Sequence, residues 1–367
     1  MKVLNISIIY TNPMPILRSR QSCFPYLCEM ENGDILASHT IGEAFESVDL
    51  TTYISKSVDG GKTFGAPVQM FDKKGEFPIK SDCAKIASDK KGKIVALGYQ
   101  FIRENVNLPV GNPETGGLLD DEVFYSVSND GGQTWSKREI INCYWGPHVE
   151  ASAPICFLSD GSWASPITGF NDWECTSNFP CEGRLLRSYD EGKTWNDDVV
   201  CMRFEDTSIS CFEQRICQID NGNIIIIGWN ESLKTGELLN NHYTISTDNG
   251  KSFSKPIDTG VKGQASSVMN LGNNKILAIH AIRRDYDRPG IYGYVVDLSN
   301  GEWNIIDSAL LWEPATPVIK NKSVADIFAY LKFGQPSAIK LKNGKVFMTF
   351  WAMENGQYNT YCLEIEL

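Results

Sequence analysis

The chain has 367 residues, of which 42% are hydrophobic, 11% aromatic and 22% charged, a balance typical of a folded globular protein and not of a disordered chain. Its 34 lysines and arginines against 45 aspartates and glutamates leave a formal net charge of −11, and no basic cluster interrupts the acidic surplus. We therefore expect no nucleic-acid partner. No run of 18 apolar residues occurs, so we expect no membrane-spanning helix and no membrane partner.

The first residues, MKVLNISIIY, are typical of a β-strand and not of a secretory signal, because they lack a continuous apolar core and a small-residue cleavage site. The 11 cysteines form no C-x-x-C pair and the four histidines are not spaced as metal ligands. We expect neither a metal nor another cofactor. Buried free thiols suit a reducing compartment, which predicts a cytoplasmic location.

One short pattern occurs four times, with the form Ser-x-Asp-x-Gly-x-Thr/Ser-Trp/Phe. Its copies are SVDGGKTF, SNDGGQTW, SYDEGKTW and STDNGKSF, which start at residues 57, 128, 188 and 246. Serine and aspartate side chains hydrogen-bond nearby backbone N–H groups, glycine adopts the positive φ of a tight reversal, and the final aromatic side chain has a large surface to bury. The pattern therefore predicts a turn between two strands, and by itself it does not mark a catalytic site.

Six pairs of apolar segments are each joined by a polar corner, which predicts six β-hairpins. The corners lie about sixty residues apart, and their turn residues are Gly33, Gly92, Gly161, Gly222, Asn274 and Gly344. Six units, each able to supply four strands, fill the chain. The sequence therefore predicts an all-β fold, in which residues 1–367 form one six-bladed β-propeller domain. We expect the N-terminal segment KVLNISIIY to complete the last blade beside YNTYCLEIEL.

In such a ring, the starts of the first strands and the loops after the second strands meet at one end of the central channel, opposite the four turns. Carboxylates, arginines and aromatic residues gather at these positions, including Arg103, Glu150, Arg283 and Trp351, together with Ser152. Each one alone suits a solvated rim, but the set favours a sugar site. Two long loops, containing NVNLPVGNPETGGLLDDE and NDWECTSNFPCEG, are expected to wall this site.

The four turn motifs are those of the Asp-box (BNR) proteins, and the six-unit organisation resembles the sialidase superfamily over essentially the whole chain. The resemblance implies three arginines that clamp a substrate carboxylate, a Tyr–Glu nucleophile pair and an aspartate acid/base. Glu213 falls at the position of the family's glutamate. Cys23 and Trp229 fall where two clamp arginines are expected, and Gln335 falls where the tyrosine is expected.

The third clamp arginine is best matched by Arg288. Asp49 resembles the acid/base aspartate by its context, and Glu46 suits the spacing equally well. The scaffold and one carboxylate thus agree with the family, whereas two clamp positions and the nucleophile differ from it.

We therefore expect an exo-acting glycoside hydrolase of the sialidase-like type, which cleaves a terminal sugar, acidic sugars included, from a glycan or small oligosaccharide by carboxylate acid/base catalysis. The expected catalytic residues are Glu213, Asp49, Asp82 and Glu46. The expected substrate-binding residues are Arg215, Arg284, Arg288, Trp229, Trp173, Gln335, His148 and Tyr286.

Two alternatives remain open. The missing tyrosine and arginines favour a glycan-binding propeller without turnover. A lyase acting on a uronic-acid sugar is the other, with Tyr286 or His148 as its base.

Overall fold

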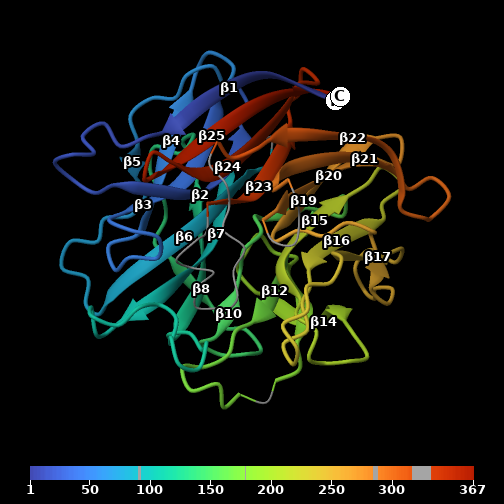
Figure 1. Cartoon of the computed structure of the whole chain (residues 1–367), viewed down its shortest axis with the longest axis horizontal. Coiled ribbons are helices and arrows are strands. Elements are labelled where there is room, and N and C mark those ends of the chain that lie inside the picture. The colour runs from blue at the N-terminus through green and yellow to red at the C-terminus, as the bar shows by residue number, and fades with distance from the viewer. Residues whose placement is uncertain (90–91, 178, 284–287, 316–331) are drawn as a thin grey trace.

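The structure is a computed structural model of the chain, and it describes all residues except 90–91, 178, 284–287 and 316–331. Six antiparallel sheets stand around a common centre, and the described residues contain no helix (Figure 1). Accordingly, none of them belongs to a helix that could cross a membrane. The predicted six-bladed β-propeller is confirmed.

The blades follow one another along the chain, each with its first strand innermost. Blade I comprises β2 (Gln21–Glu29), β3 (Ile35–Gly42), β4 (Thr51–Ser57) and β5 (Val68–Gln69). Blade II comprises β6 (Ile79–Ser88), β7 (Ile94–Arg103), β8 (Asp121–Ser128) and β9 (Glu139–Ile141). In blade III the inner strand is split into β10 (Val149–Glu150) and β11 (Cys156–Phe157), which both pair with β12 (Trp163–Gly169), followed by β13 (Glu182–Ser188) and β14 (Asn196–Arg203).

The other three blades have four strands each. Blade IV comprises β15 (Phe212–Gln218), β16 (Ile224–Trp229), β17 (His242–Ser246) and β18 (Ile257–Asp258). Blade V comprises β19 (Ser266–Gly272), β20 (Lys275–Ile282), β21 (Gly290–Asp297) and β22 (Asn304–Trp312). Blade VI comprises β23 (Phe333–Lys340), β24 (Val346–Glu354), β25 (Gln357–Glu366) and, from the other end of the chain, β1 (Lys2–Tyr10).

The ring is closed by the pairing of β1 with β25, as the sequence predicts. The two strands run antiparallel from the Lys2–Glu366 pair to the Tyr10–Thr360 pair, and Figure 1 shows them side by side. Ile9 is buried at the junction of blades VI and I, so this pairing also adds apolar contacts to the core.

The four repeated motifs form the predicted turns, one at the C-terminal end of the third strand in each of blades I to IV. In the first, Ser57 Oγ donates to Asp59 Oδ1 at 2.8 Å, and the N–H of Thr63 donates to the same oxygen at 3.0 Å. The aromatic residue that ends each motif packs into the junction with the preceding blade; these residues are Phe64, Trp135, Trp195 and Phe253. Each turn therefore also joins two blades.

Blade V contains a divergent form of the same turn that the repeat pattern misses. Ser299 N–H donates to Asp297 Oδ1 at 2.9 Å, and Gly301 has a φ of +82°. Trp303 then packs into the junction of blades IV and V. The aromatic contact between blades thus persists where the Ser-x-Asp-x-Gly spacing is lost.

The first prediction concerns ring closure. Ile9 is 4% exposed, whereas its neighbour Ile8 on the outer face of the same strand is 50% exposed. Ile9→Ala should lower the free energy of unfolding by about 2–4 kcal/mol, because it leaves a cavity at the closing junction. Ile8→Ala should change it by only about 0.5 kcal/mol. Urea unfolding of both variants tests this, and equal losses would show that β1 does not close the core.

Candidate active site

Three inner strands carry the same backbone distortion near their first residues. Phe24, Glu213 and Gln335 have φ values of +56°, +44° and +46°, and the pairing with the second strand shifts register at each of them. Such a conformation costs a residue other than glycine about 1–3 kcal/mol and requires support from its surroundings. Glu150 gives that support to Glu213, since its Oε1 and Oε2 accept the Glu213 N–H at 3.0 and 3.2 Å.

The Glu213 carboxylate lies between side chains of two blades. Trp229, at the end of β16 in the same blade, donates from Nε1 to Oε2 of Glu213 at 2.7 Å. Gln335, from blade VI, donates from Nε2 to Oε1 of Glu213. The structure therefore brings together three residues that the sequence places 16 and 122 positions apart.

Beneath Glu213, buried polar groups from blades I, III and IV fill the centre of the ring. Ser152 Oγ donates to Glu150 Oε1 at 2.7 Å and accepts from Arg215 Nη1 at 3.0 Å. Tyr26 reaches across from blade I, where its hydroxyl donates to the Ser152 carbonyl at 2.8 Å. Burial, together with the charge of Glu213, raises the pKa of Glu150 to about 7.

A second carboxyl group, that of Glu46, comes from the loop between β3 and β4. Burial raises its pKa to about 7, although the positive charges of Lys85 and Arg103 oppose the shift. Lys85 is buried, donates to the Ala151 carbonyl at 3.2 Å and lies 4.5 Å from the centre of the Tyr99 ring. Arg103 is also buried, and its Nη2 donates to the Leu108 carbonyl at 3.2 Å.

Tyr99 on β7 lies near both Glu46 and Glu213. Burial raises its pKa well above the ordinary value, and the negative charges of Glu46, Glu150 and Glu213 add to the shift. All three carboxylates therefore lie near this phenol, which remains protonated.

An aromatic cluster occupies the side of the channel formed by blades I and VI. Phe45 lies 5.4 Å from Phe24, 5.6 Å from Trp351 and 6.0 Å from Tyr358, measured between ring centres. Cys23 is 1% exposed within this cluster. Where the sialidase resemblance implies a clamp arginine, this chain therefore has a buried apolar contact.

Two of the four expected catalytic residues lie in different surroundings. Asp82 accepts hydrogen bonds from Thr51 and Thr52 and pairs with Lys73. Burial alone would raise the pKa of Asp82, but these partners hold it below its ordinary value. Asp49 is exposed at the rim and lies 3.2 Å from Arg20. The structure thus groups Glu213 with Glu46 and gives Asp82 the role of joining blades I and II.

The expected binding residues are also distributed unequally. Trp229 and Gln335 contact the Glu213 carboxylate, and Arg215 Nη1 donates to the Glu213 backbone carbonyl at 3.0 Å. His148 lies 3.8 Å from Asp120 on the blade III side, and Trp173 belongs to the long loop of that blade. Arg288 is exposed and forms an ion pair with Glu313 at 2.7 Å, while Arg284 and Tyr286 lie outside the described residues.

Blade V contributes a different arginine to the channel. Arg283 directly follows β20, and its Nη1 donates to the Phe333 carbonyl at 3.2 Å, beside Gly334 and therefore close to Gln335. Lys85, Tyr99 and Tyr26 are further channel residues that sequence patterns do not reveal. Each lies within an inner or second strand, and the only signal is a polar group at a strand position.

The two long loops contact each other at this end of the ring. Asn112 Nδ2 donates to the Trp173 carbonyl at 3.0 Å, and Leu118 N–H donates to the Asn171 carbonyl at 3.1 Å. Gly117 makes this contact possible, because a Cβ there would lie 1.9 Å from the Asp172 carbonyl oxygen.

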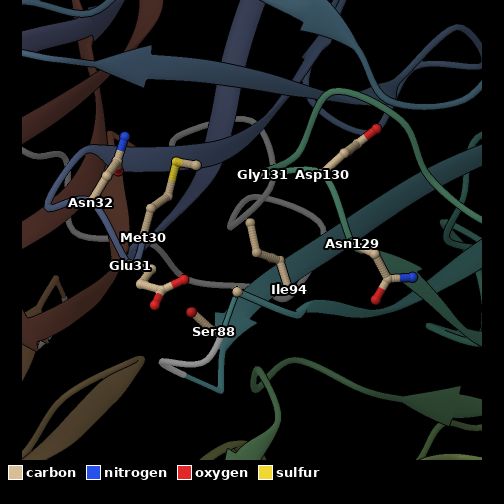
Figure 2. A pocket seen from close by; sticks show the side chains of 9 residues that line it. Met30, Glu31, Asn32, Ser88, Ile94, Asn129, Asp130 and Gly131 are labelled. Carbon is tan, nitrogen blue, oxygen red and sulfur yellow. The ribbon is translucent and has the colours of Figure 1, made fainter.

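The opposite end of the ring, where the hairpin corners and the repeated turns lie, contains a hollow. A hollow of about 390 Å³ lies between blades I and II, lined by corner and turn residues that include Glu31, Ser88, Asn129 and Asp130 (Figure 2). Asp130 is engaged there by Ser128 and Thr134 within its turn. Among the described residues, no group of three histidine, cysteine or acidic side chains is arranged to hold a metal ion.

Comparison with known proteins agrees with this architecture. A family model for the BNR/Asp-box repeat matches residues 126–137, the second of the four turns. No curated protein sequence matches the chain significantly. A protein of unknown function from Dyadobacter fermentans superposes with a TM-score of 0.74 at 18% identity, over 100% of this chain and 99% of that one.

Two sialidases are similar at lower identity. The Hadza microbial sialidase Hz136 has a TM-score of 0.65 and 12% identity over 94% of this chain, and Trypanosoma rangeli sialidase in complex with sialic acid has 0.62 and 14% over 99%. This chain spans 66% and 57% of their lengths, respectively. The fold is that of the sialidase-like, Asp-box β-propellers.

The second prediction follows from the raised pKa of Glu46. Between about pH 4.5 and 7 the folded protein holds a proton on Glu46 that the unfolded chain releases, so this group's contribution to stability falls as the pH rises. Glu46→Gln does not ionise, and its melting temperature should therefore rise relative to the wild type between pH 5 and 8. Glu43→Gln, in the same loop, reports the effect of removing an exposed charge. A difference between Glu46→Gln and wild type that is independent of pH would contradict the assignment.

The third prediction concerns the loop contact. Gly117→Ala should separate the two loops and increase amide hydrogen exchange at residues 104–120 and 170–177, because the new Cβ would overlap a backbone oxygen. Gly111→Ala is the matched control, since its Cβ would make only an ordinary 3.4 Å contact with Leu118. Unchanged exchange in Gly117→Ala would show that the loops do not depend on this close approach.

Proposed function

We propose that this protein is an exo-acting glycoside hydrolase of the sialidase-like type, which removes a terminal sugar from a glycan or oligosaccharide with two carboxyl groups. The observation that carries the proposal is the pair formed by Glu213 and Glu46 at one end of the channel. Glu213 accepts two N–H donors, whereas the pKa of Glu46 is raised to about 7, so that Glu46 retains its proton near neutral pH. Most glycosidases use one carboxyl group as acid and another as base or nucleophile.

An acidic sugar suits the charges around this pair. Lys85, Arg103, Arg215 and Arg283 contribute four positive charges near the three carboxyl groups described above. Arg103 and Arg215 have nitrogen atoms that lack a hydrogen-bond partner among the described residues. Arginine pairs well with carboxylates, and T. rangeli sialidase binds sialic acid. Because Cys23, Trp229 and Gln335 occupy positions expected to hold two arginines and a tyrosine, acidic sugars other than sialic acid belong to the proposal.

A cytoplasmic site of action, on small imported oligosaccharides, is part of the same proposal. The cysteines of the chain are free, and seven of them are buried. Such thiols suit a reducing compartment.

A glycan-binding propeller without turnover is the second candidate. The observation that favours it is Gln335, whose amide contacts Glu213 where the resemblance implies a nucleophilic tyrosine. The polar ring and the tryptophans would serve binding equally well, but a binding site does not need a carboxyl group that retains its proton near neutral pH.

The fourth prediction tests catalysis. Wild-type protein, Glu213→Gln, Glu46→Gln and the rim variant Asp49→Asn are incubated with sialyllactose, uronic-acid oligosaccharides and a panel of aryl glycosides, and products are identified by mass spectrometry. Glu213→Gln and Glu46→Gln should each lower kcat/KM by roughly 10²–10⁴-fold. Asp49→Asn should remain within a few-fold of wild type, because Asp49 lies outside the Glu213–Glu46 pair.

Three results would contradict this assignment. Binding without any product would favour the glycan-binding propeller. An unsaturated product that absorbs ultraviolet light would indicate a lyase. Loss of activity in Asp49→Asn, with Glu46→Gln active, would identify Asp49 as the acid.

A further inference from the structure

The side-chain amide of Gln335 is hydrogen-bonded to Glu213 through its nitrogen, which leaves its oxygen as an acceptor. An ionised carboxylate only accepts hydrogen bonds, so Glu213 requires the Nε2 end of the amide, which is the end that donates to its Oε1. The Oε1 end of Gln335 then points away from that bond. In the described part of the chain no donor is bonded to it, and a hydrogen-bond acceptor beside Glu213 is left for a molecule in the channel.

The carboxylate of Glu213 can also accept further hydrogen bonds. Its two oxygens each accept one donor, from Gln335 and from Trp229, and each oxygen of a carboxylate has two acceptor sites. A water molecule that donates one proton to Glu213 and the other to Gln335 Oε1 satisfies both residues.

The backbone fixes this arrangement before any substrate binds. Glu213 and Gln335 occupy matching bulges in blades IV and VI, both with positive φ, and the Glu213 N–H is held by Glu150. Strain of this kind, which blade I shares at Phe24, is typical of a functional site. The carboxylate and the amide are therefore preorganised for the same small ligand.

Glu46 approaches the channel from another side. The positive charges of Lys85 and Arg103 lower the pKa of Glu46, whereas the negative charge of Glu213 raises the pKa of Glu150. The negative charges of both Glu46 and Glu213 raise the pKa of Tyr99. Both carboxyl groups are therefore near Tyr99. Inverting glycosidases keep their carboxyl groups about 6.5–9.5 Å apart to admit a water molecule, whereas retaining enzymes hold them about 5 Å apart.

We propose that Gln335 is a catalytic residue that holds, through its Oε1, a water molecule that attacks the anomeric carbon directly, and that the hydrolysis therefore inverts the anomeric configuration. This inference rests on the proposed glycoside hydrolase activity. The water oxygen forms a bond to the anomeric carbon as the bond from that carbon to the leaving oxygen breaks. Glu213 takes a proton from the water and Glu46 gives one to the leaving oxygen, so that one water is consumed and nothing is oxidised or reduced.

Stereochemistry is the direct test. The aryl glycoside cleaved fastest in the panel above is hydrolysed in D₂O, and the anomer released in the first minutes is identified by proton NMR. The inverted anomer should appear first, and added methanol should yield no methyl glycoside. A retained anomer, or transfer to methanol, would overturn inversion while leaving the hydrolase intact. Release of no sugar from any substrate would overturn the hydrolase and the inference together.

Variants of Gln335, Gln357 and Tyr99 distinguish the remaining routes. Gln335→Met keeps the volume of the side chain but removes both polar atoms, and it should lower kcat about 100-fold with KM within threefold. Gln357→Met, at the turn of the same blade, should stay within twofold of wild type. A raised KM with unchanged kcat in Gln335→Met would overturn the water-holding role. If the wild-type protein retains the configuration and Tyr99→Phe loses that activity, Tyr99 is the nucleophile and the inference is overturned.

Discussion

Pairing of β1 with β25 closes the ring and holds the six blades in place around the axis. The two strands come from opposite ends of the chain, and their pairing completes blade VI and its junction with blade I. Blade VI carries Gln335 and blade IV carries Glu213, so their contact exists only when the blades keep their places around the axis. A feature at the outer edge of the protein thereby fixes the geometry at its centre.

Polar residues hold the centre of the ring together, while apolar residues hold the junctions between blades. Ile224, Ile225, Ile226 and Ile227 of β16 are all fully buried, because alternate residues face the blades on either side. Near the axis, by contrast, Tyr26, Ser152 and Arg215 make hydrogen bonds between blades I, III and IV. Carboxyl groups placed over this buried polar network lose solvent, and the raised pKa values of Glu46 and Glu150 follow from that burial.

Sequence reasoning recovered the parts of this protein that local patterns encode. The turn motifs and hairpin corners predicted six blades and the closing strand, and spacing from the corner glycines placed Glu213 and Gln335 at matching positions. It missed Lys85 and Tyr99, because the side chains that reach the axis depend on how neighbouring blades pack and not on any local repeat. It could not separate Asp82 from Glu46 as candidate acids, because only the fold shows that Asp82 is enclosed by Thr51, Thr52 and Lys73.

In the proposed hydrolase, a terminal sugar binds between Glu213 and Glu46. A crystal structure of the Glu46→Gln variant, soaked with the oligosaccharide that wild-type protein cleaves or binds best, would show where the sugar lies. We expect a sugar ring within hydrogen-bonding distance of Glu213 and of residue 46, with its anomeric carbon facing Gln335. A sugar in the hollow lined by Glu31 and Asn129 at the opposite end of the ring, with the Glu213 end empty, would contradict it.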